Sequence, residues 1–101
     1  MKLIKKTIFG KRYNLYIANS DSDKKKGMNI FKEVPKNTGM LFNYREELPG
    51  RSFSLKKTPF SLTVIFINNN QEIVHIEKGK PYQKKSIECI KPSSIVIEIP
   101  S

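Results

Sequence analysis

Strand-like alternation of hydrophobic and polar residues runs through most of the chain. Tyr13, Leu15 and Ile17 share one face of residues 12–17, and residues 95–99 carry isoleucines on one face and Glu98 on the other. Eight strands are predicted, at residues 2–9, 12–17, 39–44, 52–56, 62–67, 72–77, 86–90 and 95–99. The segment 62–67 is apolar on both faces, which predicts a strand in the middle of the sheet.

Turn and cap residues connect these segments. Gly10-Lys11 is the Gly-X pair of a two-residue type II′ turn, so the first two strands should pair antiparallel. Residues 20–23, Ser-Asp-Ser-Asp, resemble a helix capping box with acids at the positive end of the helix dipole. Because Gly27 and Pro35 follow, the helix should be short, near residues 20–31.

Two further segments are predicted to be turns, and two side chains of the helical region are predicted to pack in the core. Residues 45–50 should form a polar turn, and the asparagines at 68–70 tolerate the left-handed backbone of a hairpin turn. Met28 and Phe31 should face the core.

Eight short strands with one short helix predict a mostly β, α+β fold. We expect a small antiparallel β-barrel or sandwich in a single domain spanning residues 1–101.

No apolar run reaches the length of a membrane span, and no hydrophobic segment of a secretory signal follows the basic start. With a single cysteine, Cys89, the chain favours a reducing setting, and we expect a cytoplasmic protein or, alternatively, a virion component.

The net charge of +10 suggests a nucleic-acid partner, but the composition weakens that interpretation. Sixteen of the nineteen basic residues are lysine, whereas base recognition favours arginine. Lys, Ile and Asn together make up 37 residues, a pattern typical of an A/T-rich genome. A solvated lysine surface is therefore favoured over a functional basic face.

If a functional basic face exists, its contacts should come from two clusters that each surround an aromatic residue: Arg51, Lys56 and Lys57 beside Phe53, and Lys80, Lys84 and Lys85 around Tyr82.

Residues that could carry out catalysis or hold a metal are sparse. His75 and Cys89 are single and far apart in sequence, and no Cys-x-x-Cys or His-x₃-His pair occurs. A structural role is favoured for both side chains. Nucleophile elbows, phosphate loops and dinucleotide-binding glycines do not occur either, so we expect no catalytic site, no cofactor and no metal, and the chain is not predicted to be an enzyme.

Several segments, taken in order, resemble domain of unknown function family 192 (DUF192). The family has R-G-L-M, G-M-L-F, S-F-W-M-K-N-T and P-L-D-I-x-F where this chain has Lys26-Gly27-Met28 and the segments 39–42, 52–58 and 62–66. Glu98-Ile99-Pro100 resembles the family's E-[LV]-P-A-G stretch. The resemblance covers about residues 14–101. It implies a compact, mostly β fold with a short helix and no established activity.

The chain departs from the family pattern at three positions. Lys57 stands in place of Asn, Ser61 in place of Pro and Thr63 in place of Asp, and the pattern normally continues beyond the position of Ser101. The chain therefore resembles a shortened, divergent member, and a pocket that needs the family's Asn or Asp would be lost.

Three functional hypotheses follow. The first is a non-catalytic protein-interaction or structural module with an unidentified protein partner, because an unfinished sheet leaves a strand edge open for pairing. The second is electrostatic nucleic-acid binding through the two basic clusters. The third is a small-ligand binder or minor enzyme, which a cleft gathering His75, Cys89 and a carboxylate would favour.

Overall fold

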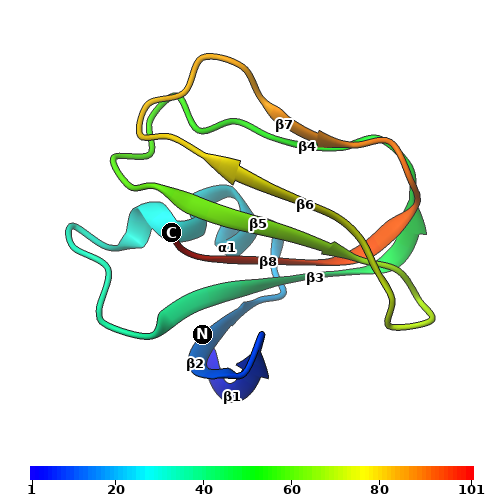
Figure 1. The fold of residues 1–101 in the computed structure, drawn as a ribbon, viewed down its shortest axis with the longest axis horizontal. Coiled ribbons are helices and arrows are strands. Elements are labelled where there is room, and N and C mark those ends of the chain that lie inside the picture. The colour runs from blue at the N-terminus through cyan, green and yellow to red at the C-terminus, as the bar shows by residue number, and fades with distance from the viewer.

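Two β-sheets make up most of the structure, a computed structural model that describes all of residues 1–101. The strands are β1 (Lys2–Ile8), β2 (Lys11–Ala18), β3 (Thr38–Leu48), β4 (Arg51–Phe53), β5 (Leu62–Ile67), β6 (Ile73–Gly79), β7 (Ile87–Cys89) and β8 (Ser93–Pro100). Six strands form one sheet in the order β1-β2-β3-β8-β5-β6, and β4 pairs with β7 in a second sheet. Figure 1 shows β4 and β7 at the top, β8 and β3 across the middle, and the β1–β2 hairpin at the bottom.

This arrangement confirms the predicted mostly β fold and all eight predicted strands. The large sheet is not closed into a barrel, because β1 and β6 are its two free ends. Of the two predicted architectures, the sandwich is the one that fits. The C-terminal strand β8 lies inside the sheet between β3 and β5, and it is β1 and β6 that present unpaired edges.

The predicted helix start is confirmed. The Oγ of Ser20 accepts a hydrogen bond from the backbone N–H of Asp23 at 3.0 Å, so α1 (Asp21–Lys26) begins at this cap. Gly27, at a φ of 52°, ends the α-helix, and a 3₁₀ turn, η1 (Gly27–Ile30), follows. Met28 is buried and Phe31 packs, half-buried, against the same core, as predicted.

The segment containing α1 and η1 also sets the direction of the next strand. β2 and β3 run parallel, whereas every other pair of neighbours is antiparallel. A parallel pair needs a connection that crosses back over the sheet, and α1 and η1 form it. This pair is an exception to the predicted antiparallel sheet. The prediction missed it because hydrophobic alternation carries no information on strand direction.

The first hairpin forms as predicted, but its turn is one residue earlier. Ile8 pairs with Lys11, which leaves Phe9 and Gly10 as the turn residues. Their φ angles are 50° and 78°, and two positive values are typical of a type I′ turn, not of the predicted type II′ turn.

The prediction of a polar turn at residues 45–50 is wrong. β3 continues to Leu48, and only the Pro49-Gly50 step turns the chain into β4. Arg45 has a φ of 62° and donates its backbone N–H to the side-chain oxygen of Asn43 at 3.1 Å. This irregularity interrupts the pairing with β8 between Asn43 and Leu48, so polar residues continue the strand beyond the buried part of the sheet.

Each face of the large sheet has its own hydrophobic core. The first core lies on the face covered by the small sheet, α1 and η1, and the second lies on the face covered by the β1–β2 hairpin. The first consists of Ala18, Met28, Met40, Phe42, Leu55, Leu62, Val64, Phe66, Ile87, Cys89 and Val96, and the second of Ile8, Leu15, Ile65, Ile97 and Ile99. Phe53 packs edge-to-face on Phe42 and Phe66, with ring centroids 5.4 and 5.9 Å apart. Its predicted packing role is therefore confirmed.

Gly39 brings β3 into very close contact with β8. A Cβ at this position would collide with the backbone carbonyl oxygen of Glu98 and would lie 2.9 Å from Cγ2 of Ile99. The backbone cannot give way easily, so only glycine fits at the first position of the Gly-Met-Leu-Phe segment.

We expect Gly39→Ala to lower the free energy of unfolding by about 1–3 kcal/mol, the usual cost of overpacking. Urea denaturation followed by circular dichroism measures this change. Lys5→Ala, at an exposed position of β1, is the control and should leave stability nearly unchanged. Equal stability of the Gly39→Ala variant and the wild type would contradict the close contact.

Candidate functional site

A hollow of about 550 Å³ lies between the short helical region and the sandwich, with Glu98 at its base. Glu98 belongs to β8 and faces the first core, because it alternates with Ile97 and Ile99, which face the second. The surrounding residues come from α1, η1, β3, β4 and the turn after β4. They are Asp21, Lys24, Lys25, Lys26, Gly27, Met28, Asn29, Phe42, Tyr44, Ser52, Phe53, Ser54, Leu55 and Thr58. We call this hollow, with Glu98, the Glu98 pocket.

The side chain of Glu98 is almost fully buried, and its carboxyl oxygens, which are not among the fully buried polar atoms without a partner, reach the hollow. The side chain is only 4% exposed, and it forms no hydrogen bond or ion pair with the rest of the chain. Burial raises the pKa of Glu98 from 4.5 to about 7, and no neighbouring cation offsets this shift. Near neutral pH the group is therefore divided between its protonated and ionised forms.

Tyr44 lines the pocket, and two cations lie against its ring. The Nζ of Lys24 lies 4.7 Å from the centre of the Tyr44 ring, and the guanidinium carbon of Arg51 lies 3.9 Å from it. Burial raises the pKa of Tyr44 to about 12, against the opposing effect of Arg51. The hydroxyl of Tyr44 thus stays protonated, and both cations stack on its ring without neutralising Glu98.

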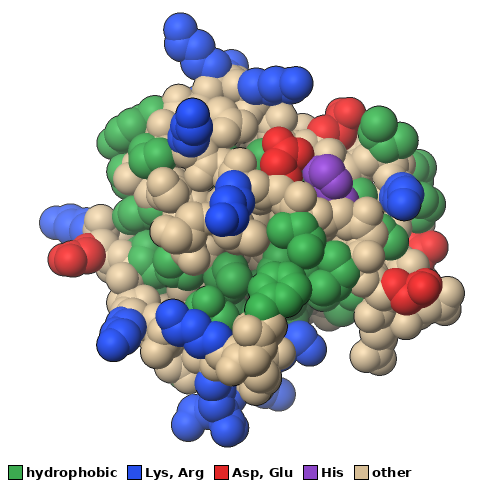
Figure 2. Space-filling view, viewed as in Figure 1, with side chains coloured by type: hydrophobic (Ala, Val, Ile, Leu, Met, Phe, Trp, Pro, Cys, Tyr) green, Lys and Arg blue, Asp and Glu red, His purple; other side chains and the backbone are tan.

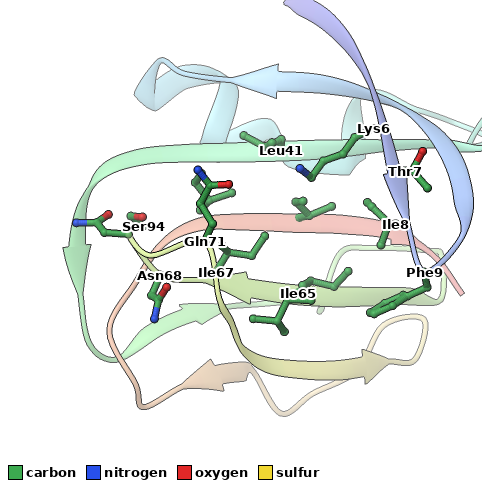
Figure 3. Close-up of a pocket in the computed structure, with 14 residues that line it drawn as sticks. Lys6, Thr7, Ile8, Phe9, Leu41, Ile65, Ile67, Asn68, Gln71 and Ser94 are labelled. Atoms are coloured by element: carbon green, nitrogen blue, oxygen red, sulfur yellow. The ribbon is translucent and has the colours of Figure 1, made fainter.

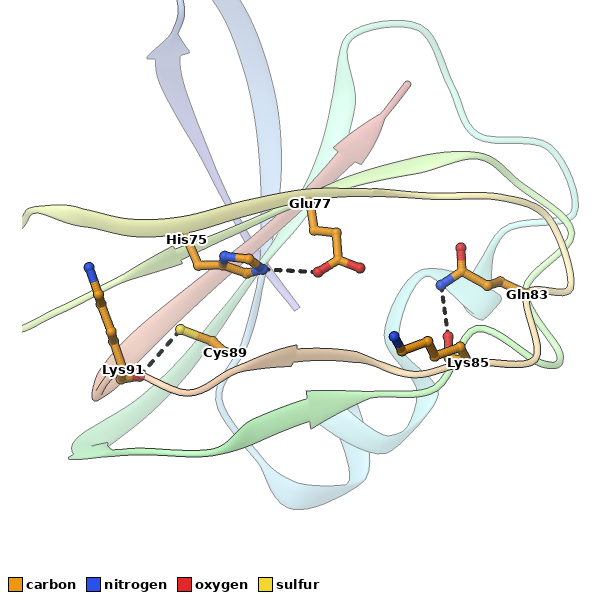
Figure 4. A network of polar contacts seen from close by, with 6 residues as sticks. All are labelled: His75, Glu77, Gln83, Lys85, Cys89 and Lys91. Carbon is orange, nitrogen blue, oxygen red and sulfur yellow. Dashed lines mark hydrogen bonds and ion pairs between the residues drawn. The ribbon is translucent and has the colours of Figure 1, made fainter.

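A second, smaller cleft has His75, Cys89 and the carboxylate of Glu88 among its lining residues. Figure 4 shows the side chains of His75 and Cys89 pointing toward each other. The cleft has a volume of about 220 Å³ and is lined by Val74, His75, Glu88, Cys89, Ile90 and Lys91. His75 Nε2 lies 2.9 Å from Glu77 Oε1, so this histidine has a partner that sequence reasoning did not identify. His75 is half-buried.

The thiol in this cleft is held in its neutral form. Cys89 is buried, and its Sγ donates a hydrogen bond to the carbonyl oxygen of Lys91 at 3.2 Å. Burial raises the pKa of the thiol, whereas a nucleophilic cysteine needs a lowered one. The cleft therefore brings together the residue types of the third hypothesis without activating the nucleophile.

The six basic residues singled out in the sequence have two different environments. Arg51 is part of the scaffold: its Nε donates to the carbonyl oxygen of Ser93 at 2.9 Å, and its Nη2 donates to the carbonyl oxygen of Glu46. The other five, Lys56, Lys57, Lys80, Lys84 and Lys85, are exposed.

The two loops that carry these lysines meet at one end of the molecule. The backbone N–H of Tyr82 donates to the carbonyl oxygen of Thr58 at 2.9 Å, which joins the β6–β7 loop to the turn after β4. On the face drawn in Figure 2, Lys and Arg side chains are nonetheless scattered over the face and its margin and do not form one continuous patch.

Sequence reasoning missed Glu98 as a site residue. It assigned Glu98 to the polar face of a strand and noted it only within the family-like Glu98-Ile99-Pro100 segment. One available signal was the isolation of this carboxylate within residues 95–99, which are otherwise aliphatic. None of the three positions that depart from the family pattern, Lys57, Ser61 and Thr63, lines the Glu98 pocket.

No cluster of three or more His, Cys, Asp or Glu side chains is arranged to hold a metal ion. No helix has the length and apolar character needed to cross a bilayer.

The raised pKa of Glu98 predicts a specific pH dependence of stability. The folded state binds the proton of the Glu98 carboxyl group more tightly than the unfolded state does. The contribution of this group to the free energy of unfolding is therefore fully present below about pH 4.5 and is lost as the pH rises through about 7. The shift corresponds to about 3 kcal/mol. Glu98→Gln should remove this dependence and raise the free energy of unfolding above pH 7.

Urea denaturation at acidic, neutral and mildly alkaline pH measures the difference between Glu98→Gln and the wild type. Glu33→Gln is the control, because Glu33 is exposed and lines none of the hollows. If wild type and Glu98→Gln lose stability in parallel over this range, Glu98 is not the group responsible.

Comparison with known proteins places the chain in a family. The model of the DUF192 family, described as uncharacterised ACR, matches residues 4–101. No curated protein matches the sequence. A solved structure from Sinorhizobium meliloti, described as a "putative transcription regulator", is 23% identical with a TM-score of 0.80, over 90% of this chain and 70% of that one. A protein of unknown function from Novosphingobium aromaticivorans is 20% identical with a TM-score of 0.80, over 98% of this chain and 72% of that one.

These two likenesses establish the fold alone, because both identities are below 25%. The match to the family model spans nearly the whole sequence and includes the segments that carry the sequence resemblance. The chain belongs to the DUF192 family.

Proposed function

We propose that this domain is a non-catalytic binding module and that the Glu98 pocket is its binding site. The observation that supports this proposal is a glutamate, 4% exposed as a residue and without a protein partner for its carboxyl group, that lines a hollow of about 550 Å³. An unpaired buried carboxylate costs free energy, and a ligand that donates hydrogen bonds to it removes that cost.

The residues that line the pocket favour a small zwitterion as its ligand. Lys24, Lys25 and Lys26 follow one another at the end of α1 and favour an anionic group at the rim, although Asp21 also lies there. Phe42 and Phe53 provide apolar walls. A guanidinium or amine at the base would pair with Glu98, and a carboxylate at the rim would face the lysines.

Binding is favoured over catalysis because Glu98 has no hydrogen bond to a second reacting group. General acid–base and nucleophilic catalysis use side chains that orient and activate one another. In the smaller cleft, the neutral thiol of Cys89 argues in the same direction.

The zwitterion 4-guanidinobutanoate is a suitable probe, because its guanidinium fork fits a carboxylate. It should perturb the backbone amide signals of residues around the pocket in NMR spectra, and pentanoate, which lacks the guanidinium, should bind much more weakly. Affinity should rise with pH through about 7, because the cation binds the ionised form of Glu98.

Glu98→Gln should weaken binding of 4-guanidinobutanoate by about tenfold or more, the effect of losing a charged hydrogen-bond partner. Glu33→Gln, which removes the same charge from an exposed loop, should bind like the wild type. Equal affinities of Glu98→Gln and the wild type, or perturbations remote from the pocket, would contradict the proposed site.

A protein partner remains part of this proposal through the open sheet edges. The β1 edge carries Lys2, Lys5 and Lys6, and edge lysines discourage strand pairing. The β6 edge strand instead exposes Ile73 and Ile76, so strand addition is better suited to β6.

Electrostatic nucleic-acid binding is the second candidate. It is supported by the meeting of the two lysine loops and by Tyr82, which is 61% exposed between Lys80 and Lys84. The description of the Sinorhizobium meliloti protein concerns that protein, and at 23% identity it adds no support for this chain.

A single-stranded DNA oligonucleotide tests this candidate. Its affinity should fall with salt at a slope of about −0.7 per phosphate contacted. The pair Lys84→Glu and Lys85→Glu should abolish most of the binding, whereas Lys2→Glu with Lys5→Glu, an equal charge change on β1, should have a much smaller effect. Absence of binding by the wild type at low salt would end this candidate.

The cellular setting stays a prediction. A free, buried cysteine is compatible with the expected cytoplasm. The alternatives of a virion component and an A/T-rich viral genome rest on composition alone.

A further inference from the structure

An apolar groove lies on the opposite face of the large sheet from the Glu98 pocket. It has a volume of about 390 Å³, within the range of about 300–1,000 Å³ typical of small-ligand sites. Figure 3 shows it between the end of β1, the strands of the large sheet and the loop after β5. Its apolar surface comes from eight side chains, Ile8, Phe9, Leu41, Ile65, Ile67, Ile73, Ile95 and Ile97.

Only one of the polar side chains around this groove can carry a charge, and that charge is positive. Lys6 is the only ionisable residue that lines it, and the other polar residues are neutral, among them Asn68 and Gln71. The carboxylates of Glu47 and Glu72 are engaged nearby as acceptors for the turn at residues 68–70. The groove therefore combines an aliphatic interior with one positive charge near its mouth.

Phe9 lines the groove and has a strained backbone conformation in the hairpin turn. Its φ of 50° is unfavourable for a bulky side chain, and the first position of a type I′ turn favours Asn, Asp or Gly. The side chain is also 66% exposed, so burial does not compensate for the strain. Figure 3 shows the Phe9 ring directed from the turn toward the groove. Strain retained at an exposed aromatic residue is typical of a functional contact.

We propose that this groove binds an aliphatic carboxylate that is free in solution. The hydrocarbon chain lies against the isoleucines, the carboxylate pairs with Lys6, and the Phe9 ring covers the chain. The positive charge of Lys6 at an otherwise apolar site selects an anionic head group over a cationic one. This site is independent of the Glu98 pocket, since the two share no residue.

Isothermal titration calorimetry with dodecanoate, below its micelle-forming concentration, tests the proposal. The wild type should bind one equivalent, and isoleucine methyl signals of the groove should shift in NMR spectra. Dodecyltrimethylammonium, with the same chain and the opposite charge, should bind at least tenfold more weakly. Comparable binding of the two probes would overturn the proposal.

Three variants separate the groove from general attraction to a basic protein. Lys6→Gln should weaken dodecanoate binding severalfold, whereas Lys5→Gln, which removes an equal charge from the neighbouring position that does not line the groove, should not. Phe9→Asn should weaken binding about tenfold while the melting temperature stays equal or rises, since Asn-Gly suits the type I′ turn. Equal effects of Lys6→Gln and Lys5→Gln, or unchanged binding by Phe9→Asn, would show that the groove is not the site.

Two further measurements complete the test. Glu98→Gln should bind dodecanoate as the wild type does, and a loss there would assign the ligand to the other pocket. Vesicles containing phosphatidylglycerol distinguish a membrane surface from a free ligand. Binding to these vesicles without binding to dodecanoate would overturn the proposal in favour of a lipid surface.

Discussion

Strand β8 is hydrogen-bonded along both edges and buried on both faces. Glu98 pairs with Met40 of β3 on one side and with Val64 of β5 on the other, so its place in the register is fixed twice. Because side chains alternate, this register directs Val96 and Glu98 into one face and Ile97 and Ile99 into the other. A shift of one residue would exchange the two sets and place Glu98 in the second core.

The same register explains why a carboxylate enters a hydrophobic core. Gly39 allows the β3 backbone to approach β8 at Glu98, and the helical connection between β2 and β3 leaves space above this point. Aromatic side chains fill one side of that space, and the lysines of α1 stand at its rim. Glu98 is therefore held in position by backbone hydrogen bonds although its own side chain has no partner.

The two faces of the sheet consequently have different chemistry. The face covered by the small sheet and α1 contains a polar pocket with a buried acid, whereas the face under the β1–β2 hairpin contains an aliphatic groove with a single lysine. The pattern of covering elements produces this difference. The helical connection brings charged side chains over one face, and a narrow hairpin leaves part of the other face open.

The sequence alone determined three features: the strands and the interior position of β5 through their hydrophobic pattern, and the helix start through its cap residues. Each depends on residues close together in sequence. Local signals also located the first hairpin, although its turn lies one residue earlier than predicted, at Phe9 and Gly10. The family-like segments indicated the fold, and their most informative residue, Glu98, could be interpreted only with its neighbours in place. The parallel pairing of β2 and β3, the meeting of the lysine loops and the burial of Glu98 were decided by the tertiary structure. Each joins segments distant in sequence, and the environment of a charged side chain depends on those segments more than on its neighbours along the chain.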